Sequence, residues 1–483
     1  MKRVFTTNLL LLLLLNILIK PFWIFGIDRS VQNLLGAGEY GMFYTLFNFS
    51  LLLNILLDLG ITNFNNREIS RYPQLIGKYF SNIVGIKIFL ALGYALITIL
   101  MALSLGYNNR QISLLLLLVF NQFLSSLILY LRSNLNGLHF FKLDSVLSVL
   151  DKTLMILICS VLLWSNIFRY DFTIEYFVLA QTISYVATAI IAFIIVIGKT
   201  GSISFKFELP FSLSMLRSSF PYAMLVLLMT VYSRVDSVVI ERILPNGDVA
   251  AGIYAQAFRL IDAANMFPFL FASLLLPIFS RMIKNSTKIS SFVGFSLVLL
   301  LVPVVSFSIP TFAFRGHIMD ILYHEHAVYS SDILGVLMGS FIFIAMGYVF
   351  GTLLTAKGEL KTLNYISFAA VVLGISVQLF LVKRFGILGA AYGNLITNGF
   401  VASLSIWFSI KLFQFNLAKN FAIRFISFAI TSIAITALLC YIDDKSSINY
   451  IIALLLSFIS AFIFKLINYK ELISFFSKET SLK

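Results

Sequence analysis

Charged and amide side chains stand within long, mostly apolar stretches of this sequence, and they carry most of its chemical information. Lys20, Arg29 and Arg259 are the clearest cases. A charge held inside a bilayer costs several kcal/mol unless it is paired or faces water, so such residues indicate a functional site. The other candidates for lining a substrate cavity are Asn54, Asp58, Lys87, Arg234 and Gln256.

Cations outnumber anions in these stretches, which favours an anionic ligand. A pyrophosphate is held by charge-assisted hydrogen bonds from Lys and Arg, and Arg can grip its oxygens bidentately. The pattern therefore predicts a phosphorylated lipid carrier rather than a cationic drug. The acids Asp28, Asp236 and Asp262 are candidates for coupling transport to an ion, and the sequence does not choose among them.

Two groups of these residues have an ordinary structural alternative. Ser50, Asn54 and Asp58 recur at i, i+4 and i+8, which places them on one face of a straight helix. They could line a cavity or form hydrogen bonds between helices, worth roughly 0.6 kcal/mol each. Arg259 and Asp262 are i, i+3 neighbours that can pair, so Arg259 either contacts substrate or ties helices together.

The sequence offers no motif for enzymatic, metal or cofactor chemistry. No Gly-x-x-x-x-Gly-Lys-Ser/Thr loop for ATP and no Ser/His/Asp set occurs. His317 and the run His324-Glu325-His326 form a metal-like cluster, but a zinc site needs a further well-placed ligand, and a solvated loop explains it. We therefore expect no enzyme, no cofactor and no metal.

The elements that position these residues are membrane helices. The chain is 60% hydrophobic and only 12% charged, with a mean hydropathy of +0.96. A soluble domain is roughly 25% charged, so the composition indicates an all-α polytopic membrane protein. The net charge of +14 is explained by cationic loops on the cytoplasmic side, and no basic surface domain for nucleic acid is present.

Segments of about 20 apolar residues predict about fourteen transmembrane helices. With the N-terminus in the cytoplasm, Lys and Arg of cytoplasmic segments outnumber those of the opposite loops by roughly four to one, which places both termini inside. The expected spans are 6–35, 40–62, 77–105, 111–131, 144–167, 174–197, 219–244, 250–279, 290–314, 332–355, 363–382, 387–410, 423–441 and 448–467.

Two stretches of the sequence resemble each other. The same spacing separates Gly41 from Gly252 and Asn54 from Asn265, and each stretch lies between the first and second helices of a six-helix set. Such a parallel repeat predicts two similarly oriented halves with the substrate site between them. The expected divisions are a six-helix lobe over 1–200, a second over 201–412, and two additional helices with a cytoplasmic tail over 413–483.

Four motifs, taken in order, resemble the multidrug/oligosaccharidyl-lipid/polysaccharide (MOP) exporter superfamily, and the resemblance is nearest to its Wzx-type polysaccharide flippases. The first is the Leu-Gly-x-x-x-Tyr-Gly close of helix one, residues 35–41. The others are Ala-Gly-Ile-Tyr-Ala-Gln-Ala-Phe-Arg-Leu over 251–260, Gly-Thr-Leu-Leu-Thr-Ala-Lys-Gly over 351–358, and Phe-Gly-Ile-Leu-Gly-Ala-Ala-Tyr-Gly over 385–393.

This resemblance implies two six-helix lobes in a V around a central cavity, followed by two extra helices. It also implies that cations of helices one, two and eight bind the lipid pyrophosphate. By position these are Lys20 and Arg29 in helix one and Arg259 in helix eight. Helix two offers Asn54 and Asp58 instead of Arg, which disfavours a peptidoglycan precursor and favours O-antigen, capsule or exopolysaccharide units.

The expected function is the flipping of an undecaprenyl-pyrophosphate-linked oligosaccharide across the bacterial inner membrane by alternating access. Its expected partners are this substrate, membrane lipids and other polysaccharide-assembly proteins, without nucleic acid. One rival is a multidrug or cation exporter of the same fold. A second rival is a membrane polymerase or ligase, which usually carries a large external loop that this sequence lacks.

Overall fold

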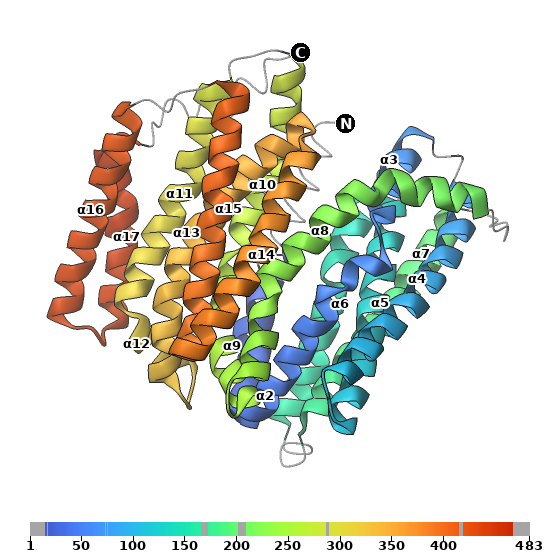
Figure 1. Ribbon diagram of the computed structural model, residues 1–483, viewed down its shortest axis with the longest axis horizontal. Helices are drawn as coiled ribbons and strands as arrows, with labels where there is room; N and C mark the ends of the chain where they lie inside the picture. Colours follow the sequence, from blue (N-terminus) through green and yellow to red (C-terminus); the bar gives the residue numbers. More distant parts are fainter. Residues whose placement is uncertain are drawn as a thin grey trace. The chain divides into compact units, whose positions relative to one another are not determined.

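The computed structural model of the 483-residue chain describes residues 15–16, 18–72, 74, 76–165, 172–200, 209–285, 289–414 and 419–466. Within these ranges every regular element is a helix (Figure 1). By its internal contacts the chain divides into two units, Met1–Ala255 (unit 1) and Gln256–Lys483 (unit 2). The lobes predicted from sequence have other borders, and those borders stay a prediction.

Unit 1 begins with a helical segment that continues into a π-helical turn and then a series of long helices. Its elements are η1 (Trp23–Asp28), α2 (Arg29–Leu52), η2 (Asn54–Leu57), α3 (Ile61–Arg71), α4 (Ile76–Ser104), α5 (Asn109–Gly137), α6 (Phe141–Trp164), α7 (Ile174–Thr200) and α8 (Leu209–Ile243). Gly36, with φ of 77° and ψ of 172°, divides α2 into the end of helix one and the start of helix two. Helix α9 (Gly247–Ala264) crosses the border between the units. An apolar core of α3, α4, α5, α6 and α7 residues, including Ile83 and Leu131, holds unit 1 together.

Unit 2 consists of helices as long as those of unit 1. Its elements are α10 (Met266–Lys284), α11 (Ile289–Ala313), α12 (Arg315–Leu322), α13 (Ala327–Lys357), α14 (Leu360–Phe385), α15 (Ile387–Phe413), α16 (Lys419–Ile442) and α17 (Ser447–Ile463). Helix α13 packs against α10, α11 and α15, and α16 and α17 pack together against α11. Val302, Phe428 and Ala461 form the centre of that last contact.

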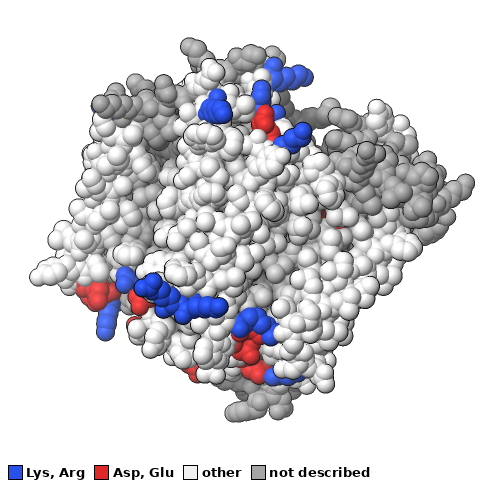
Figure 2. All heavy atoms as spheres, in the orientation of Figure 1, with Lys and Arg blue, Asp and Glu red and all other residues white. Residues whose placement is uncertain are grey.

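Eleven helices of the described residues are long and apolar enough to cross a membrane, which makes this a multi-pass membrane protein. Each matches one predicted span. The three other predicted spans differ for separate reasons: the first lies partly outside the described residues, the second is interrupted, and α17 is short. On the face in Figure 2, charged side chains lie near the helix ends, and a broad band of uncharged side chains separates them, as a bilayer requires.

The second predicted span, 40–62, is not one continuous helix. Helix α2 ends at Leu52, a short 3-10 turn follows, and α3 begins at Ile61. Between them Leu59 and Gly60 have φ of 43° and 83°, the left-handed region that interrupts a right-handed helix. A straight-helix argument placed Asn54 and Asp58 on one face, and the interruption invalidates it.

The corresponding helix of the second half stays nearly continuous at the equivalent residue. Asn54 begins η2, whereas Asn265, at the repeat spacing, lies between α9 and α10 with helical φ and ψ of −62° and −16°. Its amide donates to the carbonyl oxygen of Ile261 over 2.8 Å, and its carbonyl oxygen accepts from the amide of Phe269 over 3.1 Å. Pro268 removes one helical hydrogen bond here, because a proline cannot donate to the carbonyl four residues earlier. Of these two equivalent places, only the one in the first half leaves the helical conformation.

Two glycines allow the repeated helices of unit 1 to cross in close contact. A Cβ added to Gly41 of α2 would lie 1.8 Å from the carbonyl oxygen of Asp248 in α9. A Cβ added to Gly252 would lie 1.9 Å from the carbonyl oxygen of Ala37. The contact is reciprocal, since the spacing that relates Gly41 to Gly252 also relates Ala37 to Asp248. Only glycine fits this crossing.

Candidate functional site

Helix one changes its winding directly after Lys20. Residues 18–22 are helical, Pro21 stands among them, and Trp23–Asp28 form a π-helical turn. Proline removes a backbone donor, and π-bulges recur at functional sites. In the π-turn hydrogen bonds span five residues, so the faces of the helix shift. On a straight helix Arg29 would point away from Lys20, and here that argument does not apply.

Lys20 is partly buried and lies within electrostatic reach of Asp151, Lys152 and Arg132. Among the described residues its ammonium has neither a hydrogen bond nor an ion pair. Lys152 differs, because its Nζ lies 5.4 Å from the centre of the Trp23 ring and 3.1 Å from the Tyr185 hydroxyl. Lys152 and Arg132 thus act on Lys20, and within the described ranges Lys20 is the one of the three cations without a bonded partner.

A buried Asp accepts a hydrogen bond from a Tyr in each of the two repeated helix pairs. The hydroxyl of Tyr40 donates to Asp28 over 2.7 Å, and that of Tyr254 donates to Asp236 over 2.7 Å. Each carboxylate residue is 2% exposed. Compared at the repeat spacing, Asp236 lies three residues earlier than the counterpart of Asp28, and Tyr254 lies three residues later than that of Tyr40. The second pair is therefore about one helical turn further from the turn that joins its two helices. Two of the three acids predicted for ion coupling are therefore buried in the same kind of contact.

Arg29 and Arg234 lie in the same unit as these acids. The Nε of Arg29 is buried and has no hydrogen-bond partner in the part of the chain that the structure describes. Arg234 is partly buried and lies within electrostatic reach of the Tyr254 hydroxyl. Arg29 follows Asp28 directly in the sequence, and Arg234 lies two residues before Asp236 on α8.

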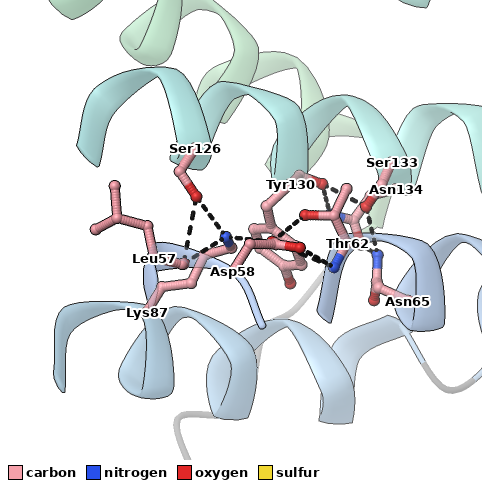
Figure 3. A network of polar contacts seen from close by, with 9 residues as sticks. All are labelled: Leu57, Asp58, Thr62, Asn65, Lys87, Ser126, Tyr130, Ser133 and Asn134. Carbon is pink, nitrogen blue, oxygen red and sulfur yellow. Dashed lines mark hydrogen bonds and ion pairs between the residues drawn. The ribbon is translucent and has the colours of Figure 1, made fainter. Parts of the chain in front are cut away.

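The helix interruption in unit 1 is built around Lys87 of α4 (Figure 3). Its Nζ donates to Asp58 Oδ1 over 2.8 Å, to Ser126 Oγ over 2.9 Å and to the carbonyl oxygen of Leu57 over 3.2 Å. Lys87 is 2% exposed and its ammonium also lies 5.9 Å from the centre of the Tyr130 ring. An ammonium has three donors, and all three are satisfied here.

Asp58 joins Lys87 to the start of α3. Its carboxylate accepts from the amide of Thr62 at 3.2 and 3.3 Å and from the Thr62 hydroxyl. This satisfies one of the free amides that every helix start presents. Asn54, one turn earlier, donates to Gln122 Oε1 over 2.7 Å, and Gln122 donates to Ser50. For Asn54 and Asp58 the structure thus shows hydrogen bonds between helices.

Unit 2 contains the remaining candidates. Arg259 and Asp262 approach to 3.6 Å, with side chains 13% and 16% exposed. Gln256 is buried and its Nε2 donates to the carbonyl oxygen of Glu325 over 3.1 Å, while its Oε1 is buried without a hydrogen bond among the described residues. The pairing predicted from the i, i+3 spacing is present, and contact of Arg259 with substrate stays a prediction.

Within unit 1 the structure forms two groups: a cationic group at helix one and the network of the interrupted helix. It brings Asn54, Asp58 and Lys87 together, and it holds Asp28 and Asp236 in matching contacts. Sequence reasoning missed Gln122 and Ser126 of α5, which complete the network. Their signal was present, because Gln122, Ser126 and Ser133 repeat at helical spacing within an apolar helix.

In the described ranges no group of three His, Cys, Asp or Glu residues could hold a metal ion. The network of the interrupted helix has the Lys87 ammonium at its centre.

A family profile matches the chain over residues 6–283, more than half of its length, and it is that of the polysaccharide biosynthesis proteins. The chain belongs to this family. Its description names polysaccharide biosynthesis and no enzymatic reaction. No protein of curated function matches the chain.

Solved structures share the fold of this family member at low sequence identity. The lipid II flippase MurJ, in an inward closed conformation, is 15% identical with a TM-score of 0.73, and the match covers 95% of this chain and 100% of MurJ. An inward-facing multidrug resistance MATE transporter of the MOP superfamily is 14% identical with a TM-score of 0.66, over 83% and 94% of the two chains. A MOP transporter from Pyrococcus furiosus is 13% identical, covers 84% and 94%, and has a TM-score of 0.57.

Proposed function

We propose that this protein flips an undecaprenyl-pyrophosphate-linked oligosaccharide, a precursor of O-antigen, capsule or exopolysaccharide, across the bacterial inner membrane. The observation that carries the proposal is its membership of the polysaccharide biosynthesis family together with helix one, where Lys20 and the Nε of Arg29 have no bonded partner among the described residues. Alternating access of two lobes would pass the polar head through the protein while the lipid tail stays in the bilayer.

The cations of helix one supply the chemistry that a pyrophosphate needs. Lys20 has no bonded partner within the described chain, and the Nε of Arg29 is a buried donor without an acceptor there. Keeping such groups in an apolar setting costs stability, and a ligand with several anionic oxygens would repay that cost. Arg234, Gln256 and Arg259 are the further groups proposed to meet the head or the first sugars.

The test is flipping by the purified protein in liposomes. A fluorescent, short-chain lipid-pyrophosphate saccharide is added, and its accessibility to a reagent outside the vesicles is followed with time. We expect Lys20→Gln and Arg259→Gln to slow flipping about tenfold or more, since each loses about one charge-assisted contact of 1.5–3 kcal/mol. Lys20→Arg should retain most activity.

The matched control is Lys383→Gln, which removes an equal charge from an exposed residue of α14. It should flip the lipid at the rate of the unaltered protein. Flipping by Lys20→Gln and Arg259→Gln at that same rate would remove the basis of the proposal.

The rival that the fold leaves open is export of organic cations, because MATE transporters share this fold. It would use the acids Asp28, Asp236 and Asp262, also our candidates for ion coupling. Uptake of a cationic dye into inverted vesicles that depends on Asp28, with no flipping of the pyrophosphate lipid, would establish the rival instead. In that case we would expect no cooperation of this protein with other polysaccharide-assembly proteins.

A further inference from the structure

The interrupted helix of unit 1 contributes to a set of three oxygen acceptors around the Lys87 ammonium. The three acceptors of Lys87 are a backbone carbonyl at a helix break, a carboxylate and a hydroxyl, at 3.2, 2.8 and 2.9 Å. Transporters that couple to sodium bind it with the same kinds of ligand, carbonyls of an unwound segment and neighbouring side-chain oxygens. Here an ammonium occupies the centre of that set.

The geometry converges from three helices on one point. Leu57 and Asp58 lie on the segment between α2 and α3, Ser126 comes from α5, and the ammonium arrives from α4 (Figure 3). Ser126 also donates to the carbonyl oxygen of Leu57 over 3.3 Å, and the Asp58 carboxylate accepts from the Thr62 amide and hydroxyl. Each acceptor residue therefore has a contact that does not involve the lysine.

The second half of the repeat has a proline in a nearly continuous helix at the matching place, and it lacks this charge arrangement. The residue at the repeat spacing from Asp58 is Phe269, so no carboxylate stands at that position. Pro268, next to it, removes one helical hydrogen bond, and the helical conformation continues around it. The lysine is therefore a particular feature of the interruption in the first half and not a general need of the fold.

We propose that the ammonium of Lys87 is a built-in replacement for a monovalent cation, and that the ligand set of Leu57, Asp58 and Ser126 is a monovalent-cation site which this chain fills from within. A tethered ammonium needs no ion gradient to stay bound, so the interrupted helix keeps its shape whether sodium is present or not. Coupling to an external ion must then use other acids. This inference does not depend on which cargo the protein carries.

The experiment removes the tethered cation and offers a free one. Lys87→Ala leaves the space of the side chain, and its melting temperature is measured in detergent micelles in Na⁺, Li⁺ or methylammonium chloride against N-methyl-D-glucamine chloride at equal ionic strength. We expect this variant to melt several degrees lower than the unaltered protein in the bulky cation. Small cations should restore much of the loss in a saturable way, as ligand binding to the folded state requires.

Three variants show whether the response belongs to this site. Lys87→Ala with Asp58→Asn lacks the carboxylate and should show no response to small cations. Lys87→Met fills the space with an uncharged chain and should be insensitive too. Lys152→Ala removes another lysine of unit 1, whose ammonium contacts a tyrosine hydroxyl and aromatic rings, and should not respond.

Two outcomes overturn the inference. The first is a melting temperature of Lys87→Ala that is equally low in all the salts. The second is an equal response of Lys87→Ala and of the form that also carries Asp58→Asn. If Lys87→Ala does not survive purification, its folded yield is compared between membranes solubilised in Na⁺ and in N-methyl-D-glucamine. Recovery in Na⁺ alone supports the inference, and equal failure counts against it. Because melting needs no cargo, these results are separate from the flipping assay.

Discussion

At the scale of single residues, two lysines in the membrane helices of unit 1 have opposite surroundings. Lys87 is buried with an acid, a hydroxyl and a carbonyl around its ammonium. Lys20 is partly buried with no bonded partner among the described residues, and two of the three charges nearest to it are also positive. The first lysine contributes to the fold, and the second is costly to the fold, which is the pattern of a residue retained for function.

This contrast predicts opposite effects on stability. Asp58→Asn leaves the buried Lys87 ammonium without its counter-ion and should destabilise the protein by about 3–5 kcal/mol, seen as a lower melting temperature in detergent. Lys20→Met should leave the melting temperature unchanged or raise it, while flipping is lost. Adding Lys87→Met to Asp58→Asn should recover part of the loss, because no charge is then left unpaired.

A result in which Asp58→Asn melts like the unaltered protein would show that the buried ion pair contributes nothing to the fold. A clear fall in melting temperature for Lys20→Met would assign Lys20 to the structure, and its part in substrate binding would then need another argument.

At the scale of elements, much of the architecture follows from the sequence, and the interruption of the second span does not. Apolar length and the Lys and Arg distribution locate most of the helices, because burial in lipid allows little else. At the break, Leu53–Gly60, the backbone contacts Lys87 and Ser126, residues that are distant in sequence. Local signals are Asp58 and Gly60, two residue types common in turns, but the apolar run around them outweighs this signal.

The sequence predicts the repeat, and the structure shows which of the repeated residues contact each other. Gly41 and Gly252 were recognised by their spacing, and the structure shows that each packs against the backbone of the other's helix. Similarly, Asp28 and Asp236 were named as separate candidates, and only the structure shows their matching tyrosine contacts. Spacing alone identifies equivalent residues, and it does not say which of them meet.

The close crossing of α2 and α9 predicts the effect of adding a single methyl group at Gly41. Gly41→Ala places a Cβ where the Asp248 carbonyl oxygen lies 1.8 Å away, so the helices must separate. Overpacking of this kind costs about 1–3 kcal/mol, so we expect a lower melting temperature and impaired flipping. Gly93→Ala in α4, with nothing within 4 Å of the new methyl group, is the matched control and should change neither. Equal behaviour of the two variants would contradict the close crossing.

At the scale of the whole molecule, the charge distribution is expected to set its orientation. Charged side chains lie near the helix ends and an uncharged band separates them on the visible face (Figure 2). Cationic loops remain in the cytoplasm during insertion, and the sequence places Lys361 on that side and the turn at Asp444 on the other. The direction in which a lipid-linked glycan would be carried depends on this orientation, so it is tested separately.

Single cysteines report the orientation directly. In a background with Cys159 and Cys440 replaced by serine, Asp444→Cys and Lys361→Cys each place an exposed thiol in a turn or at a helix start. A membrane-impermeant maleimide applied to spheroplasts should label Asp444→Cys at once and Lys361→Cys only after the membrane is opened. The reverse pattern would place both termini outside. A glycan assembled in the cytoplasm would then meet the opposite end of the transporter, and the charge rule would fail for this chain.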